Sequence, residues 1–149
     1  MIKASDIMET NITSVAPDTD IPVAVRILLD KHINGVPVVN DQEELVGILC
    51  QSDLIFQQKE MTVPPIFTIL DSVFPLSSSK KINEEFRKIA ATTVAQAMVK
   101  KVISVAPDTP VSEIASLMVE KHFHTIPVVK NKKLVGIIGK EDVLKTLTP

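Results

Sequence analysis

The sequence predicts a mixed α/β (α+β) fold, in which two copies of one β-α-β-β-α unit pack with pseudo-two-fold symmetry and a hydrophobic helical insert separates them. The first observation is an internal repeat, because residues 14–19 (SVAPDT) return as residues 104–109. The second is the order of patterns in each copy, a helical apolar stripe and then two β-branched runs. The third is size, because a unit of about 50 residues is marginal for an independent core and favours packing of the copies on each other.

The two copies are not in constant register. Residues 45–48 (LVGI) return as residues 134–137, which is 89 positions later, whereas the earlier motif returns 90 positions later. The slip falls between the polar segments 40–44 and 130–133. A turn between two strands can absorb such an insertion, so we expect a hairpin turn at each of these places.

An amphipathic helix is expected after the repeated SVAPDT motif. In the second copy, Thr109 is expected to cap this helix, with Pro110 at its first helical position. Pro22 falls in the first turn of the corresponding helix, where proline is tolerated. Apolar residues then follow at positions i, i+3, i+4 and i+7: Ile21, Ala24, Val25 and Leu28 in the first copy, and Val111, Ile114, Ala115 and Met118 in the second.

Two β-branched runs separated by a polar turn follow each helix, which is the pattern of an antiparallel pair of strands. A second helix is expected after the pair, and a short strand ahead of each unit. In the first copy we expect the short strand at residues 11–15, the strand pair at 36–39 and 45–49, and the second helix at 52–59. In the second copy we expect the short strand at residues 102–105, the strand pair at 126–129 and 134–138, and the second helix at 141–148.

Composition argues against several classes of function. A formal net charge of −2 gives no positive field to attract nucleic acid or an anionic membrane. A single cysteine excludes an internal disulfide, and the N-terminus lacks the apolar segment of a signal peptide, so we expect a cytoplasmic location. No apolar run approaches the ~18 residues needed to span a membrane, so we expect no membrane insertion.

A long segment separates the copies, and we divide the chain into a first repeat (1–56), an insert (57–93) and a second repeat (94–149). The insert is too long for a simple connection, and four of the five phenylalanines lie in or beside it. Three serines at residues 77–79 are suited to cap a helix that runs through about residue 91. We interpret the insert as a hydrophobic arm that packs on its own module or on a dimer mate. The alternatives are a docking surface for a regulated partner and, less favoured, a membrane-surface segment.

Asp53 and its repeat Asp142 are the leading candidates for ligand binding. Each stands at the start of an expected helix, directly after a strand. Such a carboxylate can accept hydrogen bonds from the hydroxyls of a ligand, with the helix N-terminus near an attached phosphate. An acid in the first helical turn is also favourable with no ligand at all. Both interpretations are open from the sequence.

One ordered set of motifs occurs twice: a strand ending in SVxPDT, a helix, hydrophobic-Pro-Val-Val, LVGI and an Asp that opens a helix. This set resembles a tandem pair of cystathionine-β-synthase (CBS) domains, the Bateman module. The resemblance implies an adenosyl ligand (AMP, ADP, ATP or S-adenosylmethionine) between the repeats. It also implies a homodimer, in which two pairs form a flat disc of four repeats. No other cofactor is implied.

The resemblance implies two crossed sites, in which the ribose-binding Asp of one repeat faces the segment before the proline of the other. There the hydrophobic residue and the proline would hold the base, and the polar residues ahead of them would approach phosphate. The first site would combine Asp53 and Ser52 with Phe123, His124, Thr125, Ile126 and Pro127, and the second Asp142 and Lys140 with Ile33, Asn34, Gly35, Val36 and Pro37. Backbone groups near Thr13 and Ile103 would read the edge of the base.

The chain departs from the family pattern three residues before each Asp. The family usually has Ser or Thr there, whereas this chain has Cys50 and Gly139, which are poor hydrogen-bonding substitutes. Ser52 can supply a hydroxyl to the first site, and Lys140 a positive charge to the second. His124 matches a position that often contacts phosphate in nucleotide-binding members, although it also suits a solvated loop. The first site is therefore the better equipped.

Other chemistry is disfavoured. The segment His122-Phe123-His124 with Cys50 lacks the spacing of a metal site. His32 and His122 fall at equivalent helix C-termini, where an imidazole can bond terminal carbonyls. Cys50 is interpreted as an inert thiol at a strand end, and the sequence offers no catalytic constellation or glycine-rich phosphate loop.

Two functions follow from this sequence. The first is a stand-alone regulatory module, not an enzyme, that binds an adenosyl ligand and acts in trans on a partner protein, because the chain leaves no room for a catalytic domain. The second is a ligand-free, homo-oligomerising interaction scaffold whose nucleotide sites have decayed, which the departures at Cys50 and Gly139 favour.

Overall fold

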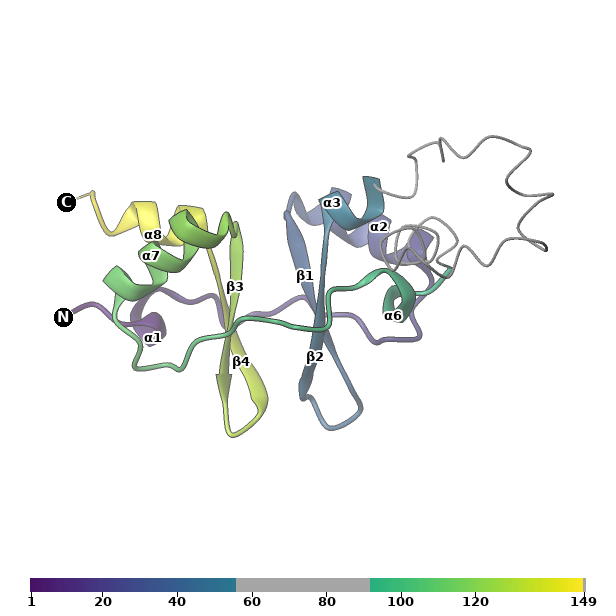
Figure 1. Cartoon of the computed structure of the whole chain (residues 1–149), viewed down its shortest axis with the longest axis horizontal. Coiled ribbons are helices and arrows are strands. Elements are labelled where there is room, and N and C mark those ends of the chain that lie inside the picture. Colours follow the sequence, from purple (N-terminus) through teal and green to yellow (C-terminus); the bar gives the residue numbers. More distant parts are fainter. Residues whose placement is uncertain (56–91, 149) are drawn as a thin grey trace, which may run out of the picture.

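The computed structural model describes residues 1–55 and 92–148 and shows two similar halves side by side (Figure 1). Each half contains one β-hairpin flanked by helices, and the two hairpins lie next to each other at the centre of the molecule. The expected mixed fold of helices and small sheets is confirmed. Nearly all of the insert, including the helix expected through residue 91, lies outside the described residues.

The two repeats have the same order of elements. The first contains helix α2 (Ile21–Lys31), strands β1 (Gly35–Val39) and β2 (Leu45–Cys50), and helix α3 (Gln51–Ile55). The second contains helix α7 (Val111–Lys121), strands β3 (Thr125–Lys130) and β4 (Lys133–Gly139), and helix α8 (Lys140–Lys145). Both strand pairs are antiparallel, as the alternation of β-branched runs and polar turns predicts.

The start of α7 differs from the expectation by one residue. Pro110, not Thr109, occupies the N-cap position, with an extended ψ of 147°. The Thr109 hydroxyl instead accepts a hydrogen bond from the Ala106 N–H at 3.1 Å, and the Thr19 hydroxyl does the same for the Ala16 N–H at 3.2 Å. Both threonines therefore close the turn ahead of the helix, which explains why they do not cap it.

The short strands expected ahead of each unit are reduced to single bridges. Val15 pairs with Val38 of β1, and Val105 pairs with Val128 of β3, both in the parallel sense. The preceding residues, 11–14 and 102–104, form no strand because they cross from one half of the molecule to the other. The expectation of strands over 11–15 and 102–105 is therefore wrong except at their last residues.

Two short helices that were not expected from the sequence lie on segments that cross between the halves. Helix α1 (Ala4–Ile7) lies beside α7 and α8, although it belongs to the start of the chain (Figure 1). Helix α6 (Val94–Ala97) lies beside α2, although it precedes the second repeat. Each repeat is thus completed by the segment that precedes the other one.

Hydrogen bonds and burial hold both crossed segments. Ala4 is fully buried in the core of the second repeat, and Glu9 and Ile137 exchange backbone hydrogen bonds of 2.8 and 3.0 Å. Val94 is fully buried in the core of the first repeat, and Ile48 and Val99 exchange backbone bonds of 3.0 and 2.9 Å. Each hairpin is therefore also paired with a segment from a distant part of the chain, through Glu9 at Ile137 and through Val99 at Ile48.

The glycines of the repeated LVGI motif admit these crossed segments. A Cβ atom at Gly136 would overlap the Sδ of Met8 and lie 2.8 Å from its Cγ. A Cβ atom at Gly47 would overlap the Sδ of Met98 and lie 3.0 Å from its Cγ. Each methionine packs directly over the backbone of a central strand, where only glycine leaves room.

The register slip between the copies falls in the hairpin turns, as expected. The β3–β4 turn consists of Asn131 and Lys132, both with positive φ (53° and 69°), as in a type I′ turn. The β1–β2 turn is longer, and the side-chain oxygen of Asn40 accepts hydrogen bonds from the backbone of Gln42 and Glu44 at 2.9 and 3.0 Å. Asn40 thus stabilises the turn that carries the extra residue.

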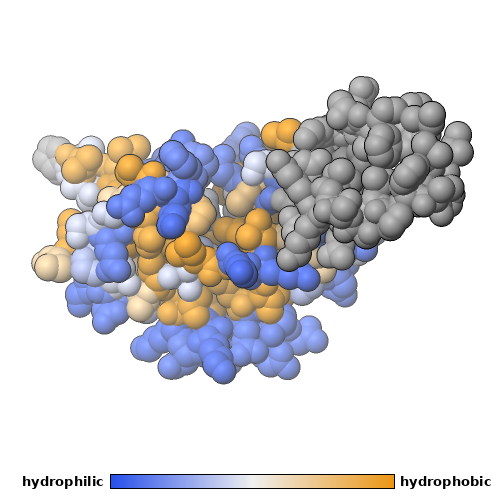
Figure 2. Space-filling model, viewed as in Figure 1, coloured by the Kyte–Doolittle hydropathy of each residue, from blue (hydrophilic) through white to orange (hydrophobic). Residues whose placement is uncertain are grey.

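Hydrophilic residues gather at the hairpin turns, whereas apolar surface occupies the middle of the same face (Figure 2). Each half has its own cluster of buried aliphatic residues, and the segments that cross between the halves contribute to both clusters. Among the helices of residues 1–55 and 92–148, none combines the length and the apolar character that crossing a bilayer requires.

Candidate ligand-binding site

Two cavities lie between the repeats, one beside each of the equivalent acids. The Asp53 pocket has a volume of about 500 Å³, and the Asp142 pocket has a volume of about 310 Å³. Each cavity places the helix-opening acid of one repeat opposite the segment that enters the first strand of the other. In the Asp53 pocket that segment is residues 121–125, and in the Asp142 pocket it is residues 32–35.

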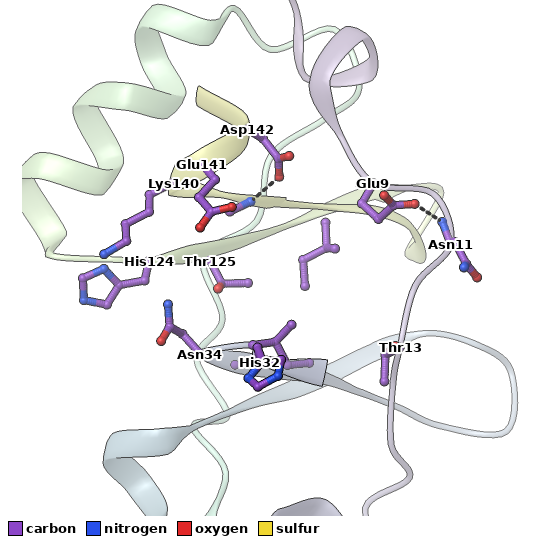
Figure 3. A pocket seen from close by; sticks show the side chains of 14 residues that line it. Glu9, Asn11, Thr13, His32, Asn34, His124, Thr125, Lys140, Glu141 and Asp142 are labelled. Atoms are coloured by element: carbon purple, nitrogen blue, oxygen red, sulfur yellow. Dashed lines mark hydrogen bonds between the residues drawn. The ribbon is translucent and has the colours of Figure 1, made fainter. Parts of the chain in front are cut away.

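The two acids have the same local geometry. Asp53 lies in the first turn of α3, is 6% exposed, and accepts a hydrogen bond from the Cys50 N–H at 2.9 Å. Asp142 lies in the first turn of α8 and accepts a hydrogen bond from the Gly139 N–H at 2.8 Å (Figure 3). Each acid reaches back from the third helical position to the residue ahead of the helix, which is half of a capping box.

The other half of a capping box needs a hydroxyl on the residue ahead of the helix. Cys50 and Gly139 stand at these positions and have no hydroxyl. The departures noted in the sequence therefore affect helix capping as well as any ligand contact. A carboxylate has about four acceptor positions, so a bond to a backbone amide does not by itself prevent the carboxylate from accepting ribose hydroxyls. Both interpretations of Asp53 and Asp142 can hold together.

Three residues line both pockets and form a shared wall: Asn34, His124 and Thr125. Asn34 and His124 are equivalent positions, 90 residues apart. The Asn34 carbonyl accepts a hydrogen bond from the Gln51 N–H at 2.9 Å, and the His124 carbonyl accepts one from the Lys140 N–H at 3.2 Å. Each segment is thereby held against the start of the second helix of its own repeat. His124 was expected in the first site only, whereas its position serves both.

Most of the expected residues line one of the two cavities, and those of them that were assigned to a particular site line that site; Thr13 and Ile103 were expected near the base without assignment to either site. In the Asp53 pocket these are Ser52, Asp53, Ile103, Phe123, His124, Thr125 and Pro127, and in the Asp142 pocket Thr13, Ile33, Asn34, Gly35, Lys140 and Asp142. Three others do not line the cavities. Ile126 and Val36 are fully buried in the two cores, and Pro37 is less than 2% exposed.

Most of the charged residues that line the pockets were not among the residues predicted from the sequence. The crossing segments contribute Glu9 and Asn11 to the Asp142 pocket and Lys101 to the Asp53 pocket. Helix ends add Glu141 to the former and Lys121 to the latter. The internal repeat could have pointed to two of these residues, because a shift of 90 positions makes Asn11 and Lys101 equivalent.

His32 and His122 line one pocket each and end α2 and α7 in the left-handed conformation, with φ of 53° and 57°. Histidine is among the few residue types other than glycine that are enriched in this conformation. The backbone N–H of His32 donates to the carbonyls of Leu28 and Leu29. The terminal carbonyls of α2 are thus satisfied by the backbone of His32, whereas we expected its imidazole to bond them.

A family model for the CBS domain matches the chain twice, over residues 4–60 and 94–148. The chain belongs to the CBS-domain family. The two matches begin at the first residues of α1 and α6. Each CBS repeat therefore includes, in sequence, the short helix that packs on the other CBS repeat in space.

Curated relatives contain this CBS pair in different contexts. An uncharacterized protein of Methanocaldococcus jannaschii is 30% identical over 95% of the chain and 89% of its own length. The chloroplastic CBS domain-containing protein CBSX2 of Arabidopsis thaliana is 28% identical over 91% of the chain, which spans 58% of it. A homoserine O-acetyltransferase of Methanosalsum zhilinae is 28% identical over 98% of the chain, which spans 24% of that enzyme. The CBS pair is thus nearly all of one relative and a smaller part of others.

Solved structures confirm the paired fold. The crystal structure of CBSX2 in complex with AMP has a TM-score of 0.82 and 24% identity, covering 99% of this chain and 97% of that one. The CBS domain pair of protein MJ0100 in complex with 5′-methylthioadenosine and S-adenosylmethionine has a TM-score of 0.69 and 22% identity, covering 99% and 96%. In the part of the present chain that is described, no group of three or more His, Cys, Asp or Glu side chains is arranged to hold a metal ion.

Proposed function

We propose that this CBS pair is a regulatory module that binds an adenosyl ligand (AMP, ADP, ATP or S-adenosylmethionine) between its repeats and signals in trans to a partner protein in the cytoplasm. The Asp53 pocket is the observation that carries the proposal. In it a carboxylate that is 6% exposed faces the polar segment ahead of Pro127. The cavity of about 500 Å³ falls within the usual size of small-molecule sites.

The Asp53 pocket offers a partner for each part of an adenosine phosphate. The Asp53 carboxylate suits the two ribose hydroxyls as a charged acceptor. Val99 and Ile103, each 38% exposed, offer apolar surface to the base, and Lys101 and Lys121 offer positive charge to the phosphate. The complexes of CBSX2 with AMP and of MJ0100 with two adenosyl compounds support an adenosyl ligand for a chain of this fold.

A regulatory role follows from where the ligand lies. Each pocket has walls from both CBS repeats, so a bound ligand contacts both at once. A ligand that fits one arrangement of the repeats better than another shifts the module toward it, and a partner bound to the module can respond to that shift. The chain therefore needs no chemistry of its own to act as a sensor.

We also propose that the module is a homodimer. Equivalent residues on the outer faces of α2 and α7, Leu29 and Val119, are 62% and 74% exposed. Equivalent residues of α3 and α8, Ile55 and Leu144, are 68% and 58% exposed. Apolar side chains exposed at matching positions of both repeats favour an association surface. The same surface favours the alternative function, a ligand-free scaffold with decayed nucleotide sites.

A search for bound nucleotide separates these two functions. The chain has no Trp and no Tyr, so adenine that copurifies with it dominates the ultraviolet absorbance. A thermal-shift panel of adenosyl compounds then tests binding directly, because a ligand of the native state raises the melting temperature. A scaffold with decayed sites carries no nucleotide and shows no shift with any compound in the panel.

A further inference from the structure

The two pockets carry opposite charge. The walls of the Asp53 pocket have two lysines, Lys101 and Lys121, and one carboxylate. The walls of the Asp142 pocket have one lysine, Lys140, and three carboxylates, those of Glu9, Glu141 and Asp142. Pseudo-symmetry of the backbone therefore does not extend to the electrostatic field that a ligand meets.

The opposite charge arises at positions that the repeat makes equivalent. Lys101 in the Asp53 pocket corresponds to Asn11 in the Asp142 pocket. Ser52 corresponds to Glu141, with the shift of 89 that applies after the hairpin turn. These two substitutions account for two of the three charge units by which the pockets differ, and the backbone scaffold around them is shared.

Two of the three carboxylates of the Asp142 pocket are held in place by backbone amides. Glu9 Oε1 accepts a hydrogen bond from the Asn11 N–H at 2.8 Å, and Asp142 Oδ2 accepts one from the Gly139 N–H at 2.8 Å (Figure 3). Both acids come from different elements and border one cavity of about 310 Å³. Carboxylates fixed around a cavity repel a phosphate and attract a cation. Repulsion between a pocket and a ligand of the same charge is a common source of binding specificity.

We propose that the two pockets bind different classes of adenosyl compound: the Asp53 pocket binds the phosphorylated one, and the Asp142 pocket binds one with a positive charge, such as a sulfonium. This inference rests on the proposed function, since it assigns a ligand class to each pocket. It makes the module a sensor of two compounds, whose pockets share the wall formed by Asn34, His124 and Thr125.

Isoleucine methyl groups report on the pockets separately in the full chain. Ile103 lines only the Asp53 pocket, and Ile137 lines only the Asp142 pocket, among the residues that the structure describes. We expect AMP to shift the methyl resonances of Ile103 at concentrations that leave Ile137 unchanged, and S-adenosylmethionine to shift Ile137. S-adenosylhomocysteine lacks the sulfonium charge and is expected to bind at Ile137 about 5-fold more weakly, because one exposed charge pair contributes up to ~1 kcal/mol.

Placing the charged and polar residues of one pocket into the other tests whether charge determines which ligand each pocket binds. The variant Asn11→Lys with Glu141→Ser gives the Asp142 pocket the residues of its counterpart, and we expect it to bind AMP at Ile137 about 10-fold more tightly than the wild type. The control Ser112→Lys with Glu120→Ser makes the same change in net charge on exposed positions of α7, outside both pockets, and is expected to leave AMP binding unchanged.

The outcomes separate this inference from the proposed function. AMP that shifts Ile137 as readily as Ile103, or a charge exchange with no effect, overturns the assignment of ligand classes and leaves adenosyl binding intact. If AMP, S-adenosylmethionine and S-adenosylhomocysteine all fail to shift both resonances, the proposed function itself is wrong.

Discussion

Replacing Gly136 by alanine should loosen the N-terminal segment from the second CBS repeat. The new Cβ would overlap Met8 Sδ and lie 2.8 Å from Met8 Cγ and 3.0 Å from Met8 Cβ. Rotation of the methionine side chain can relieve the first two contacts but not the third, because the Cβ is fixed to the backbone. Overpacking of this kind costs about 1–3 kcal/mol. The substitution should therefore lower the melting temperature by about 2–9 °C in a chain of this size.

The loss should fall on the crossed segment rather than on the whole chain. Four backbone hydrogen bonds dock residues 4–9 of this segment: from Ala4 N–H to Thr109 O, from Ser5 N–H to Pro107 O, and the two exchanged between Glu9 and Ile137. At about 1 kcal/mol each, they contribute roughly 4 kcal/mol, so a clash of 1–3 kcal/mol weakens the docking without abolishing it. Hydrogen exchange followed by mass spectrometry should show faster exchange in residues 4–9 of Gly136→Ala.

Gly139→Ala is the matched control, because it adds the same methyl group at the end of the same strand. Outside the adjacent residues, the nearest described atom to its Cβ would be the Oδ2 of Asp142, at 3.7 Å. Gly139 is the N-cap of α8, so the control should cost below about 1 kcal/mol. If Gly136→Ala unfolds at the same temperature as Gly139→Ala, and residues 4–9 stay protected, the crossed packing of Met8 over Gly136 is wrong.

Three further predictions concern the ligand, the turn and the dimer. Asp53→Asn should weaken AMP binding by at least about 10-fold, since a hydrogen bond to a charged group contributes about 1.5–3 kcal/mol. Calorimetry should show little change for the control Asp142→Asn, and equal losses in the two variants would contradict the assignment. Lys132→Gly should raise the free energy of unfolding by up to about 1 kcal/mol in urea titrations, because Lys132 has φ of 69° in a turn that favours Asn-Gly; a loss of stability would count against that turn. Leu29→Glu with Val119→Glu should convert the proposed dimer to a monomer in light scattering, and a dimer that survives both charges places the interface elsewhere.

The elements with strong local patterns were predictable from the sequence. The apolar residues of α2 recur with the period of a helix, and two β-branched runs typical of strands follow it. Each pattern is complete within a short stretch of sequence, so tertiary contacts did not change the type of element. The hairpin turns were located by the one-residue slip near Asn40 and Asn131, because insertions between copies collect in turns. The crossed pairing of Asp53 with His124 came from the family resemblance, because residues so far apart in sequence share no local signal.

The crossed helices were not predictable by the same means. Four residues make barely one helical turn, and so short a helix is stable only through tertiary packing. The segment after α1 was expected to be a strand, although most of it only crosses the molecule and lines a pocket. The repeat does pair Met8 with Met98 and Gly47 with Gly136, but the shared contact between each Met and a Gly becomes evident only in three dimensions.

We expect the shared wall to make ligand binding in one pocket depend on ligand binding in the other. Asn34 and His124 border both cavities, so a ligand that fixes either side chain for one pocket changes the wall that the other ligand meets. The crossed segments add a second link, because the chain that lines the Asp142 pocket at Glu9 pairs with β4, and the chain that lines the Asp53 pocket at Val99 pairs with β2. If AMP changes the affinity for a second compound, that compound must change the affinity for AMP by the same factor. Calorimetry in both orders measures this factor, and a factor of one shows that the shared wall transmits nothing.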